Sequence, residues 1–434
     1  MHSDKVRPLR GTRVIDLTWV QVGPQTTRLL ATFGAEIIRV ECPYPNGMDV
    51  VRQVPPFTPN HATPDGGRIQ GAAQSTGIPG NYNRSALFNN TNAGKYGITL
   101  DLNHPKGREL LKRLVTTANV LSENFSPDQM RKWNLTYEEI RQINPQIIYL
   151  QTTGMGKAGV YGNFASYGPT AQALSGLTFM SGLPEQSLPA GWGFSYLDHS
   201  PGYFGAFLLM AALRRQRDEK IGCYIDMSQA ETGLMLSGTS LLEFQISGRP
   251  TTRYGNRMPY AEWVPHGAFR CKGEDNWIAI SIQSEIEWRL LCEELGSPEW
   301  SRAGKFATAA SRRDNQDELE TLLTSRTVEL DRFDLMHRLQ LRGIAAGVVQ
   351  KAPDRLDLDP QLKARGFYVD LPSSEIGTWP VDGFPARLSR SPAKVGGLPG
   401  RAAPKLGEDN QKIYRDLLGL SDAEISALRE EKII

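Results

Sequence analysis

The 434-residue sequence has few of the residues that build metal sites or disulfide frameworks. Its four cysteines, Cys42, Cys223, Cys271 and Cys292, lie far apart without a CxxC pair, and the six histidines are equally scattered. Zinc sites and disulfide scaffolds both require a characteristic spacing of cysteine or histidine. We therefore expect neither a bound metal nor a disulfide framework.

The sequence also lacks an excess of charge of one sign and a long apolar run. Its 49 Lys and Arg nearly balance its 47 Asp and Glu, which leaves a formal net charge of +2. Binding to nucleic acid or to a membrane surface usually requires a basic field or a polybasic tail, and neither is present. No apolar run reaches about 18 residues, and the N-terminal MHSDKVRPLRG has no apolar core typical of a signal peptide. We expect a soluble cytoplasmic protein that binds small molecules, with no nucleic-acid or membrane partner.

The first half of the chain alternates short apolar runs with helical patterns. Strands are expected at 13–18, 35–40, 98–102, 118–124 and 147–151, with helices between most of them. This alternation is typical of an α/β domain with a parallel sheet. Gln21 lies in the turn after the first strand, where open parallel sheets bind ligands. No GxGxxG or GxxxxGK[ST] motif occurs, so we predict neither a dinucleotide site nor a P-loop.

The second half has a different pattern, which indicates a smaller α+β domain. A hairpin is expected from 267–271 and 277–282, followed by helices at 288–295 and 316–330. We divide the chain into a large α/β domain (1–228), a linking helix (229–254), a small α+β domain (255–330) and a C-terminal segment (331–434). The Pro- and Gly-rich residues 43–90 are predicted to form a long surface excursion.

The stretch 167–205 is interrupted repeatedly by Gly and Pro, and it contains Asp198. Asp198 precedes Ser-Pro-Gly and an apolar run, a position typical of a helix N-cap or an Asx-turn. Loops held by a rigid frame also carry catalytic groups, so this carboxylate could be a nucleophile. The residues alone leave both interpretations open.

Many short segments, taken in order, resemble the class III CoA-transferases, also called the CaiB/BaiF family. The matching segments are 14–17, 20–24, 30–35, 40–41, 98–102, 105–108, 123–125, 127, 144–149, 172–176, 198–199, 202, 255–256, 277–280, 343–347, 359–362 and 365–367. The resemblance covers almost the whole chain. It implies a Rossmann-like large domain with a parallel sheet, a smaller α+β domain, and an interlocked dimer in which the C-terminal segment returns to the large CoA-binding domain.

The family's reaction moves CoA from an acyl-CoA thioester to a free carboxylic acid, through mixed-anhydride and aspartyl-CoA thioester intermediates. The resemblance implies that Asp198 is the nucleophile and that Gln21 is the polar group near the reacting carbonyl. The capping and catalytic roles of Asp198 are compatible, because backbone amides at a helix N-terminus orient a carboxylate. For Gln21, simple capping of the Gly23-Pro24 turn remains the alternative.

The resemblance also implies a binding site for CoA, which acts as a substrate and not as a tightly bound cofactor. Val20, Asn124 and Phe125 occupy the family's CoA-binding turns, and Arg131 and Lys132 are candidate phosphate partners. Lys132 could equally be an ordinary surface lysine.

One phosphate partner of some family members is missing from this chain. Cys42 follows Glu41 at a position where those members carry an arginine. We expect Arg39 or Arg52 to make the replacement contact.

The residues expected around the acyl group indicate a substrate larger than formate or oxalate. Met258, Tyr260 and Trp263 replace a glycine-rich loop and are predicted to line an apolar acceptor pocket with Tyr167, although packing on the core is equally common for such aromatic residues. Gly168 replaces an acidic residue of some members, which removes a candidate second carboxylate. Succinyl-CoA with a benzylsuccinate-type acceptor is the expected substrate pair, and carnitine-type or bile-acid-type acceptors remain open.

Two alternatives concern the reaction and the assembly. The family's α-methylacyl-CoA racemases carry a histidine where this chain has Tyr167, and a tyrosine with a pKa near 10 is a poor base for that reaction. The assembly could be a homodimer or a heteromer with a related subunit. Because Asp198 and Gln21 are both present, we expect this chain to be the active partner.

Overall fold

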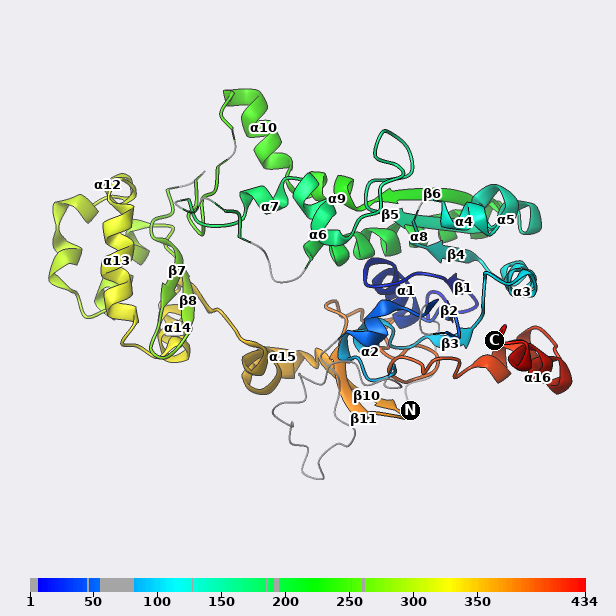
Figure 1. Cartoon of the computed structure of the whole chain (residues 1–434). Helices are drawn as coiled ribbons and strands as arrows, with labels where there is room; N and C mark the ends of the chain where they lie inside the picture. The colour runs from blue at the N-terminus through cyan, green and yellow to red at the C-terminus, as the bar shows by residue number, and fades with distance from the viewer. Residues whose placement is uncertain are drawn as a thin grey trace. The chain divides into compact units, whose positions relative to one another are not determined.

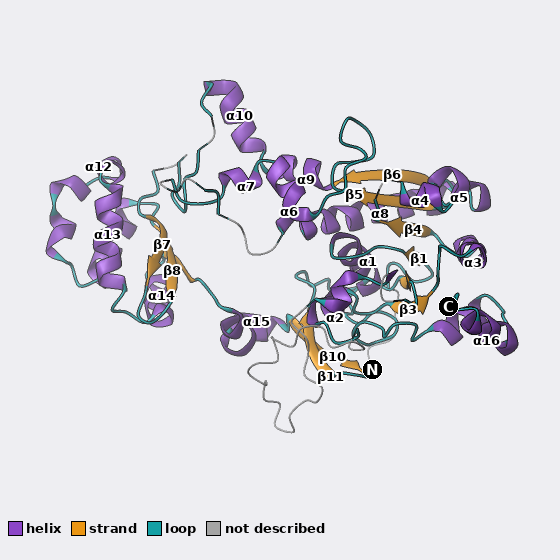
Figure 2. Ribbon diagram, in the orientation of Figure 1, coloured by secondary structure: helices purple, strands orange, loops and turns teal. Residues whose placement is uncertain are grey.

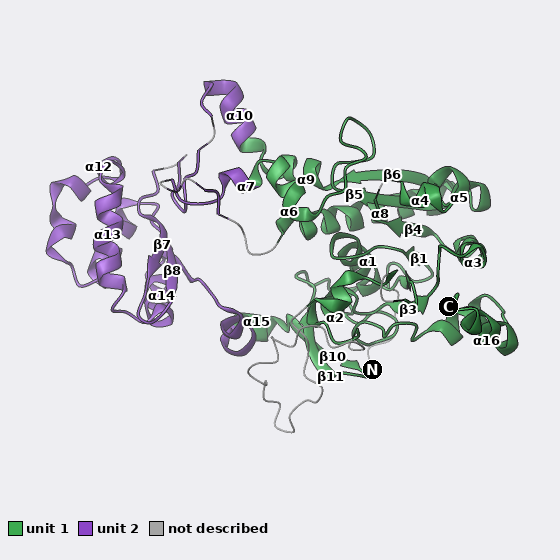
Figure 3. Ribbon diagram, in the orientation of Figure 1, with its two compact units in different colours: residues 1–177, 192–239, 361–434 green, residues 178–191, 240–360 purple. Residues whose placement is uncertain are grey.

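The computed structural model describes residues 7–44, 47–54, 82–126, 128–184, 186, 188–190, 195–250, 252–259 and 262–434. Residues 55–81 of the expected surface excursion, and Tyr260, lie outside the described residues. The chain forms two compact units (Figure 3): residues 1–177, 192–239 and 361–434 make the first, and residues 178–191 and 240–360 make the second. The second unit thus contains residues 331–360, which the division by sequence placed in the C-terminal segment.

The first unit is built on a parallel sheet with the strand order β3-β2-β1-β4-β5-β6. Its strands are β1 (Arg13–Asp16), β2 (Glu36–Glu41), β3 (Tyr96–Thr99), β4 (Val120–Glu123), β5 (Ile148–Thr153) and β6 (Cys223–Ser228). This is the strand order of a Rossmann fold, in which ligands bind at the carboxyl ends of the strands where the order reverses. The prediction of a Rossmann-like parallel sheet is confirmed, and the reversal lies between β1 and β4.

Helices cover both faces of this sheet (Figures 1 and 2). Val14 packs in one core cluster with residues of α1 (Val22–Thr32) and α8 (Ser200–Glu219). Ile15 packs in the opposite cluster with residues of α3 (Pro105–Thr116), α5 (Tyr137–Ile143) and α16 (Asp422–Glu430). Because successive residues of a strand point to opposite faces, the strands contribute apolar side chains to both clusters.

The C-terminal segment packs on the first unit. The hydroxyl of Tyr414, in the π-helix Lys412–Leu417, donates to the carbonyl of Thr99 at 2.6 Å, and the Asp101 amide donates to the Ile433 carbonyl. Earlier in the same segment, β10 (Tyr368–Ser373) and β11 (Gly377–Asp382) form an antiparallel hairpin. No hairpin was predicted there, because Pro372 and Pro380 weaken the strand pattern.

The second unit contains an antiparallel sheet of β7 (His266–Arg270), β8 (Trp277–Ser281) and β9 (Ala345–Val348). Its larger helices are α10 (Gly238–Ser247, which begins in the first unit), α11 (Glu285–Glu294), α13 (Gln316–Thr327) and α14 (Arg332–Leu341). Its shorter elements are α7 (Leu177–Met180), η5 (Glu299–Arg302), η6 (Gly304–Phe306), α12 (Ala309–Asp314) and a π-helix (Asp354–Leu358). Helix α15 (Pro360–Arg365) begins at the last residue of this unit and otherwise belongs to the first. The predicted hairpin is present, and the unit has its own apolar core around Ile278, Leu291 and Leu335.

The remaining short elements lie in the first unit. They are η2 (Val50–Gln53), α2 (Ala86–Thr91), α4 (Gln129–Lys132), α6 (Gly168–Leu174), η4 (Tyr196–Asp198) and α9 (Gln229–Leu236). The linking helix expected at 229–254 is divided at Ser237 into α9 and α10, which ends at Ser247. In the described part of the chain, no helix combines the length and apolarity needed to span a membrane.

Candidate active site

The loop after β1 is held in an unusual backbone conformation at Val20. Its φ angle is 66°, a left-handed value that is a clear outlier for a β-branched residue. The Val20 amide donates to both carboxylate oxygens of Asp49 at 3.1 Å, and Asp49 accepts from Arg39 at 2.5 Å. A buried ion pair therefore holds the strained residue in place.

Arg39 and Arg52 are fully buried in this ion-pair network, which corrects the phosphate contact expected of them. Arg39 pairs with Asp49 and with Glu41, and Arg52 pairs with Glu41 at 2.7 Å. Burial alone would raise the pKa of Glu41, but Arg52 and Arg39 lower it to about 2. Neither guanidinium has an exposed face for a phosphate group, because the chain encloses both with their acidic partners.

Asn124 and Phe125, at the carboxyl end of β4, lie beside the loop that follows β1. The Asn124 side chain accepts from the Trp19 amide at 2.7 Å and donates to the Trp19 carbonyl at 2.9 Å. The Phe125 ring packs edge-on against Trp19 at 5.5 Å and Trp133 at 5.3 Å between ring centroids. These contacts join the two loops on either side of the point where the strand order reverses.

Glu123 supports the same turn, although no functional role was predicted for it from the sequence. Its carboxyl accepts from the Phe125 amide at 2.8 Å and is fully buried. Burial raises the pKa of the Glu123 carboxyl to about 8, which the hydrogen bond from Phe125 only partly opposes. The burial of this carboxyl could not be predicted from the sequence, because Glu123 simply ends the apolar run of a strand and nothing local indicates what covers it.

Asp198 does not cap the long helix that follows it, so the N-cap prediction is wrong. Asp198 ends the short 3₁₀ helix η4, and α8 begins two residues later at Ser200, with His199 at its N-cap. The Asp198 carboxylate instead faces the start of α9, where the Gln229 amide donates to it at 3.4 Å. Burial raises the pKa of Asp198, and contacts with Ser195, Gln229 and the Gly168 amide oppose that rise.

Gly168, at the start of α6, packs directly against this carboxylate. A Cβ at position 168 would lie 2.1 Å from Ser195 Oγ and 2.5 Å from Asp198 Oδ1. A Cβ atom essentially never lies within 3 Å of another side-chain atom in this way, so residue 168 must be glycine for Asp198 to keep its place. The acidic residue that some family members carry at this position would therefore not fit beside Asp198 as it is placed here.

Gln21 contacts the residue that follows Asp198. Its Nε2 lies 3.3 Å from His199 Nδ1, and its Oε1 is buried without a hydrogen-bond partner among the described residues. Gln21 stands at the N-cap of α1 but makes no side-chain capping bond, so the capping alternative is not observed. Burial lowers the pKa of His199, and Asp198 partly opposes that shift. A neutral imidazole has one ring nitrogen free to accept from the Gln21 amide.

Two cavities of the first unit lie along the carboxyl ends of the strands. The first, of about 290 Å³, is lined by Trp19, Val20, Val22, Asn124, Phe125, Ser126, Thr152, Thr153, Gly154, Phe164, Ala165, Ser166, Tyr167, Gly168, Asp198 and Gln229. We call it the Asp198 cavity. The second, of about 280 Å³, lies where β1, β2 and β3 end, and Trp19, Phe125 and Ser126 line it as well. We call it the strand-end cavity.

The structure gathers part of the predicted site in the Asp198 cavity. Val20, Asn124, Phe125 and Tyr167 line it together with Asp198, whereas Gln21 does not. Arg131 and Lys132 are exposed on α4 and line neither cavity, although the neighbouring Gln129 and Trp133 line the strand-end cavity. Arg131 pairs with Asp128 at 2.8 Å.

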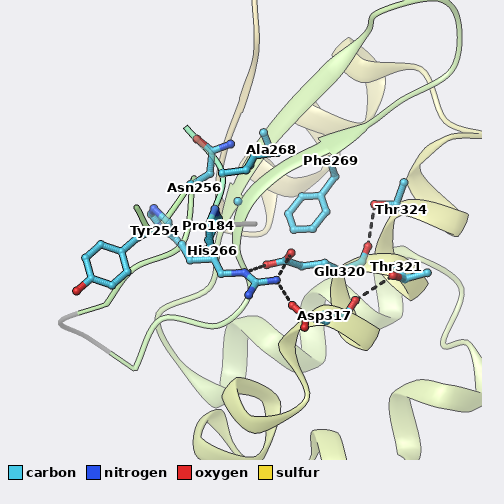
Figure 4. A pocket seen from close by; sticks show the side chains of 14 residues that line it. Pro184, Tyr254, Asn256, His266, Ala268, Phe269, Asp317, Glu320, Thr321 and Thr324 are labelled. Carbon is cyan, nitrogen blue, oxygen red and sulfur yellow. Dashed lines mark hydrogen bonds and ion pairs between the residues drawn. The ribbon is translucent and has the colours of Figure 1, made fainter. Parts of the chain in front are cut away.

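A third cavity, of about 480 Å³, lies within the second unit (Figure 4). Arg257 reaches across it to Glu320 at 2.8 Å and to Asp317 at 2.5 Å. Met258 and Trp263, predicted to line an acceptor pocket, do not line this cavity, and the Trp263 ring packs 6.1 Å from that of His266. Tyr260 lies outside the described residues.

Comparisons with known proteins match this chain to CoA-transferases over nearly its whole length. The model of CoA-transferase family III matches residues 9–410. A succinate–glutarate CoA-transferase of Agrobacterium fabrum is 30% identical and covers 94% of this chain and 96% of its own length. A succinyl-CoA–D-citramalate CoA-transferase of Chloroflexus aurantiacus is 29% identical, over 99% of this chain and 98% of its own. A solved CaiB/BaiF family protein from Brucella suis has a TM-score of 0.81 and 30% identity, over 94% of this chain and 99% of that one.

Proposed function

Because the chain belongs to CoA-transferase family III, we propose that Asp198 is the nucleophile that carries CoA between two carboxylic acids. The observation behind this proposal is the Asp198 cavity, in which Asp198 is the only acidic side chain among the described lining residues. A carboxylate whose pKa is raised by burial is also the more basic nucleophile.

The reaction consists of four displacements at carbonyl carbons. An Asp198 oxygen attacks the donor thioester, the C–S bond breaks, and a mixed anhydride and the CoA thiolate form. The thiolate then attacks the Asp198 carbonyl carbon, and the C–O bond breaks to release the donor acid. The acceptor carboxylate attacks the resulting aspartyl-CoA thioester, whose C–S bond breaks to give a second mixed anhydride and the CoA thiolate. The thiolate finally attacks the acceptor's acyl carbon, and the C–O bond to Asp198 breaks to free the Asp198 carboxylate. Electrons and atoms balance without a metal or a redox partner.

Each displacement passes through a tetrahedral oxyanion that needs fixed hydrogen-bond donors. We assign this role to the Gln21 amide, whose contact with His199 Nδ1 places it beside the residue that follows Asp198. Loss of one such donor typically lowers kcat about 100-fold to 1000-fold.

We place CoA along the two adjoining cavities. The strand-end cavity would take the nucleotide, and the pantetheine arm would pass the shared wall of Trp19, Phe125 and Ser126 to bring the thioester to Asp198. Arg131 and Lys132 stay candidates for the phosphate groups, because α4 begins three residues after Ser126 of this wall. Both side chains are also exposed to solvent.

For the substrates we propose succinyl-CoA as donor and a dicarboxylic acid as acceptor. The names of the two relatives, a succinate–glutarate and a succinyl-CoA–D-citramalate CoA-transferase, support this pair. A bulky acceptor such as a benzylsuccinate is a finer proposal, supported by Phe164 and Tyr167 in the cavity lining. A racemase would need a second base beside Asp198, and no histidine occurs among the described lining residues, so nothing specific favours that alternative.

The proposal is tested by incubating the protein with a panel of acyl-CoAs and mapping adducts by mass spectrometry. We expect CoA attached to the peptide that contains Asp198, and CoA transfer to an added acid. Asp198→Ala and Asp198→Asn should lose both the adduct and the transfer. Transfer at the wild-type rate by Asp198→Ala would disprove the assignment.

A further inference from the structure

The four displacements of the proposed reaction place the oxyanion at two different positions. In the first and the last, the attacked carbon belongs to the acyl group, so the negative charge develops on an oxygen of the substrate. In the second and the third, the attacked carbon is the carboxyl carbon of Asp198, so the charge develops on an oxygen of Asp198 itself. Because Asp198 is part of the chain, the fold determines which groups surround this second oxyanion.

The side chain of Gln229, the first residue of α9, lies beside the Asp198 carboxylate. Its Nε2 donates to the Leu197 carbonyl at 2.6 Å and to Asp198 Oδ1 at 3.4 Å. Both acceptors are oxygens, so the group between them is the NH2 of the carboxamide, which has two hydrogens to donate. The short bond to Leu197 therefore holds the carboxamide in place and leaves its second hydrogen for Asp198.

Helix α9 is a rigid support for this donor. Its N-cap residue, Ser228, makes a side-chain capping bond directly before Gln229. One turn further along, a Cβ at Gly233 would lie 2.8 Å from Leu197 Cδ1, so α9 packs closely on the turn that carries Asp198. Donors that are fixed before the reaction are the ones that stabilise an oxyanion effectively.

Oδ1 is also the oxygen of Asp198 that Gly168 covers. A Cβ at position 168 would lie 2.5 Å from Oδ1, and the Gly168 amide is a further donor to the carboxylate. With Gly168 and Gln229 both packed on Oδ1, the other oxygen, Oδ2, is left to attack the donor thioester. Oδ1 then remains the carbonyl oxygen of the mixed anhydride and of the CoA thioester.

The length of the bond from Gln229 is consistent with a role in the transition state. At 3.4 Å, it is longer than the roughly 2.7–3.2 Å that is usual for an N–H···O bond, so it stabilises the resting carboxylate only weakly. Oδ1 is a neutral carbonyl oxygen in the anhydride and the thioester, and it carries a full negative charge in the tetrahedral state. A donor whose bond strengthens as this charge develops lowers the barrier.

We propose that Gln229 is a catalytic residue that donates a hydrogen bond to the oxyanion on Asp198 Oδ1. This inference rests on the proposed function, in which Asp198 is the nucleophile. When the CoA sulfur adds to the Asp198 carboxyl carbon, an electron pair of the C=O bond moves to Oδ1, beside the Gln229 amide. The pair returns as the C–O bond to the donor acid breaks. The same contact serves when the acceptor carboxylate displaces CoA, and Gln21 then serves the oxyanion on the substrate.

The test measures how fast CoA becomes attached to Asp198 in a single turnover. Excess protein is mixed with succinyl-CoA and quenched at intervals, and the peptide that contains Asp198 is followed by mass spectrometry. Gln229→Met keeps the shape of the side chain and removes the donor. Because loss of one oxyanion donor typically lowers the rate about 100-fold to 1000-fold, we expect CoA attachment to slow by about 100-fold. The Kd for free CoA, measured by calorimetry, should not change.

Gln172→Met is the matched control for the loss of a buried glutamine. Gln172 is 4% exposed and Gln229 is 5% exposed. Gln172 accepts from the Tyr196 amide at 3.0 Å, in the same 3₁₀ turn that ends with Asp198, so its bond goes to the backbone and not to the carboxylate. Both variants lose a hydrogen bond to this turn and should melt at a lower temperature than the wild type. Gln172→Met should nevertheless attach CoA at close to the wild-type rate.

A second variant, Gln229→Asn, covers the case in which Gln229→Met does not fold. It keeps a carboxamide but shortens the side chain by one methylene, which withdraws the amide from Oδ1, so CoA attachment should slow in the same way.

Three results would overturn the proposal. The first is CoA attachment at the wild-type rate in the folded Gln229 variants. The second is an equal loss of rate in Gln172→Met, which would show a structural role. The third is a higher Kd for CoA with an unchanged rate, which would show that Gln229 binds CoA and not the oxyanion. Failure of the proposed function would differ from all three, because the wild-type protein would then attach no CoA to Asp198.

Discussion

At the scale of single residues, the Asp198 carboxylate depends on the absence of a side chain at Gly168. Gly168→Ala would place a methyl group 2.5 Å from Asp198 Oδ1, so the carboxylate must move. A displacement of about 1 Å can cost about 100-fold in rate. We expect kcat to fall by about this factor, as measured by steady-state CoA transfer.

Gly176→Ala is the control for glycine replacement in the same region. No atom lies within 4 Å of a Cβ built there, but its φ of +82° makes alanine strained. This variant should lose stability and keep its kcat. Equal kcat in Gly168→Ala and the wild type would contradict the packing argument.

The buried Glu123 gives a prediction for the pH dependence of stability. Its pKa is raised to about 8 by burial, above the ordinary value near 4.5. The unfolded chain therefore releases this proton at lower pH than the folded chain does, so the free energy of unfolding decreases as pH rises from about 4.5 through 8. Glu123→Gln keeps an acceptor for the Phe125 amide and removes the titration.

Denaturant unfolding at pH 5 and pH 8 measures this effect. We expect Glu123→Gln to gain stability relative to the wild type between the two pH values. A constant difference between the two proteins at both pH values would show that Glu123 does not titrate in this range.

At the scale of elements, the loop between β1 and α1 is fixed through Asp49 rather than by its own sequence. Asp49 holds the strained Val20 amide and also balances the buried charge of Arg39. Asp49→Ala removes both contacts, whereas Asp49→Asn keeps an oxygen for the Val20 amide. Removing one partner of a buried ion pair typically costs about 3–5 kcal/mol.

We therefore expect both variants to lose about 3 kcal/mol or more of unfolding free energy, as measured by urea titration. Asp49→Ala should in addition raise KM for acyl-CoA more than Asp49→Asn does, because Val20 lines the Asp198 cavity. If the two variants bind acyl-CoA equally well, the Val20 contact has no role in the site.

The order of strands and helices could be predicted from the sequence in the first half of the chain, where apolar runs alternate with helical patterns. Five of the six parallel strands were predicted at positions that overlap the observed ones, because each contains a short apolar run. Asp198 could be placed in the site only through the family resemblance, and its local geometry was mispredicted because a 3₁₀ turn intervenes before α8. The buried partners of Arg39 could not be predicted, since they depend on contacts between segments that are separate in the sequence.

At the scale of the whole molecule, the outer faces of two helices indicate association with another chain. On α8, Tyr203, Phe207 and Met210 follow one another at helical spacing and are 50%, 64% and 40% exposed. Helix α10 has no buried residue, although it carries Leu241, Leu242, Phe244 and Ile246. Large apolar side chains that gather on exposed helix faces usually mark an interface.

The interlocked dimer inferred from the family resemblance supplies such a partner, and it makes a prediction that an ordinary dimer does not. Light scattering should give twice the chain mass of 48.1 kDa. Threaded chains cannot separate without unfolding, so dilution to low nanomolar concentration should leave the mass unchanged, whereas an ordinary dimer of moderate affinity would dissociate. Phe207→Asp, which places a charge in the apolar face of α8, should reduce the yield of folded dimer rather than release folded monomers. A folded monomer at micromolar concentration would rule out the threaded assembly.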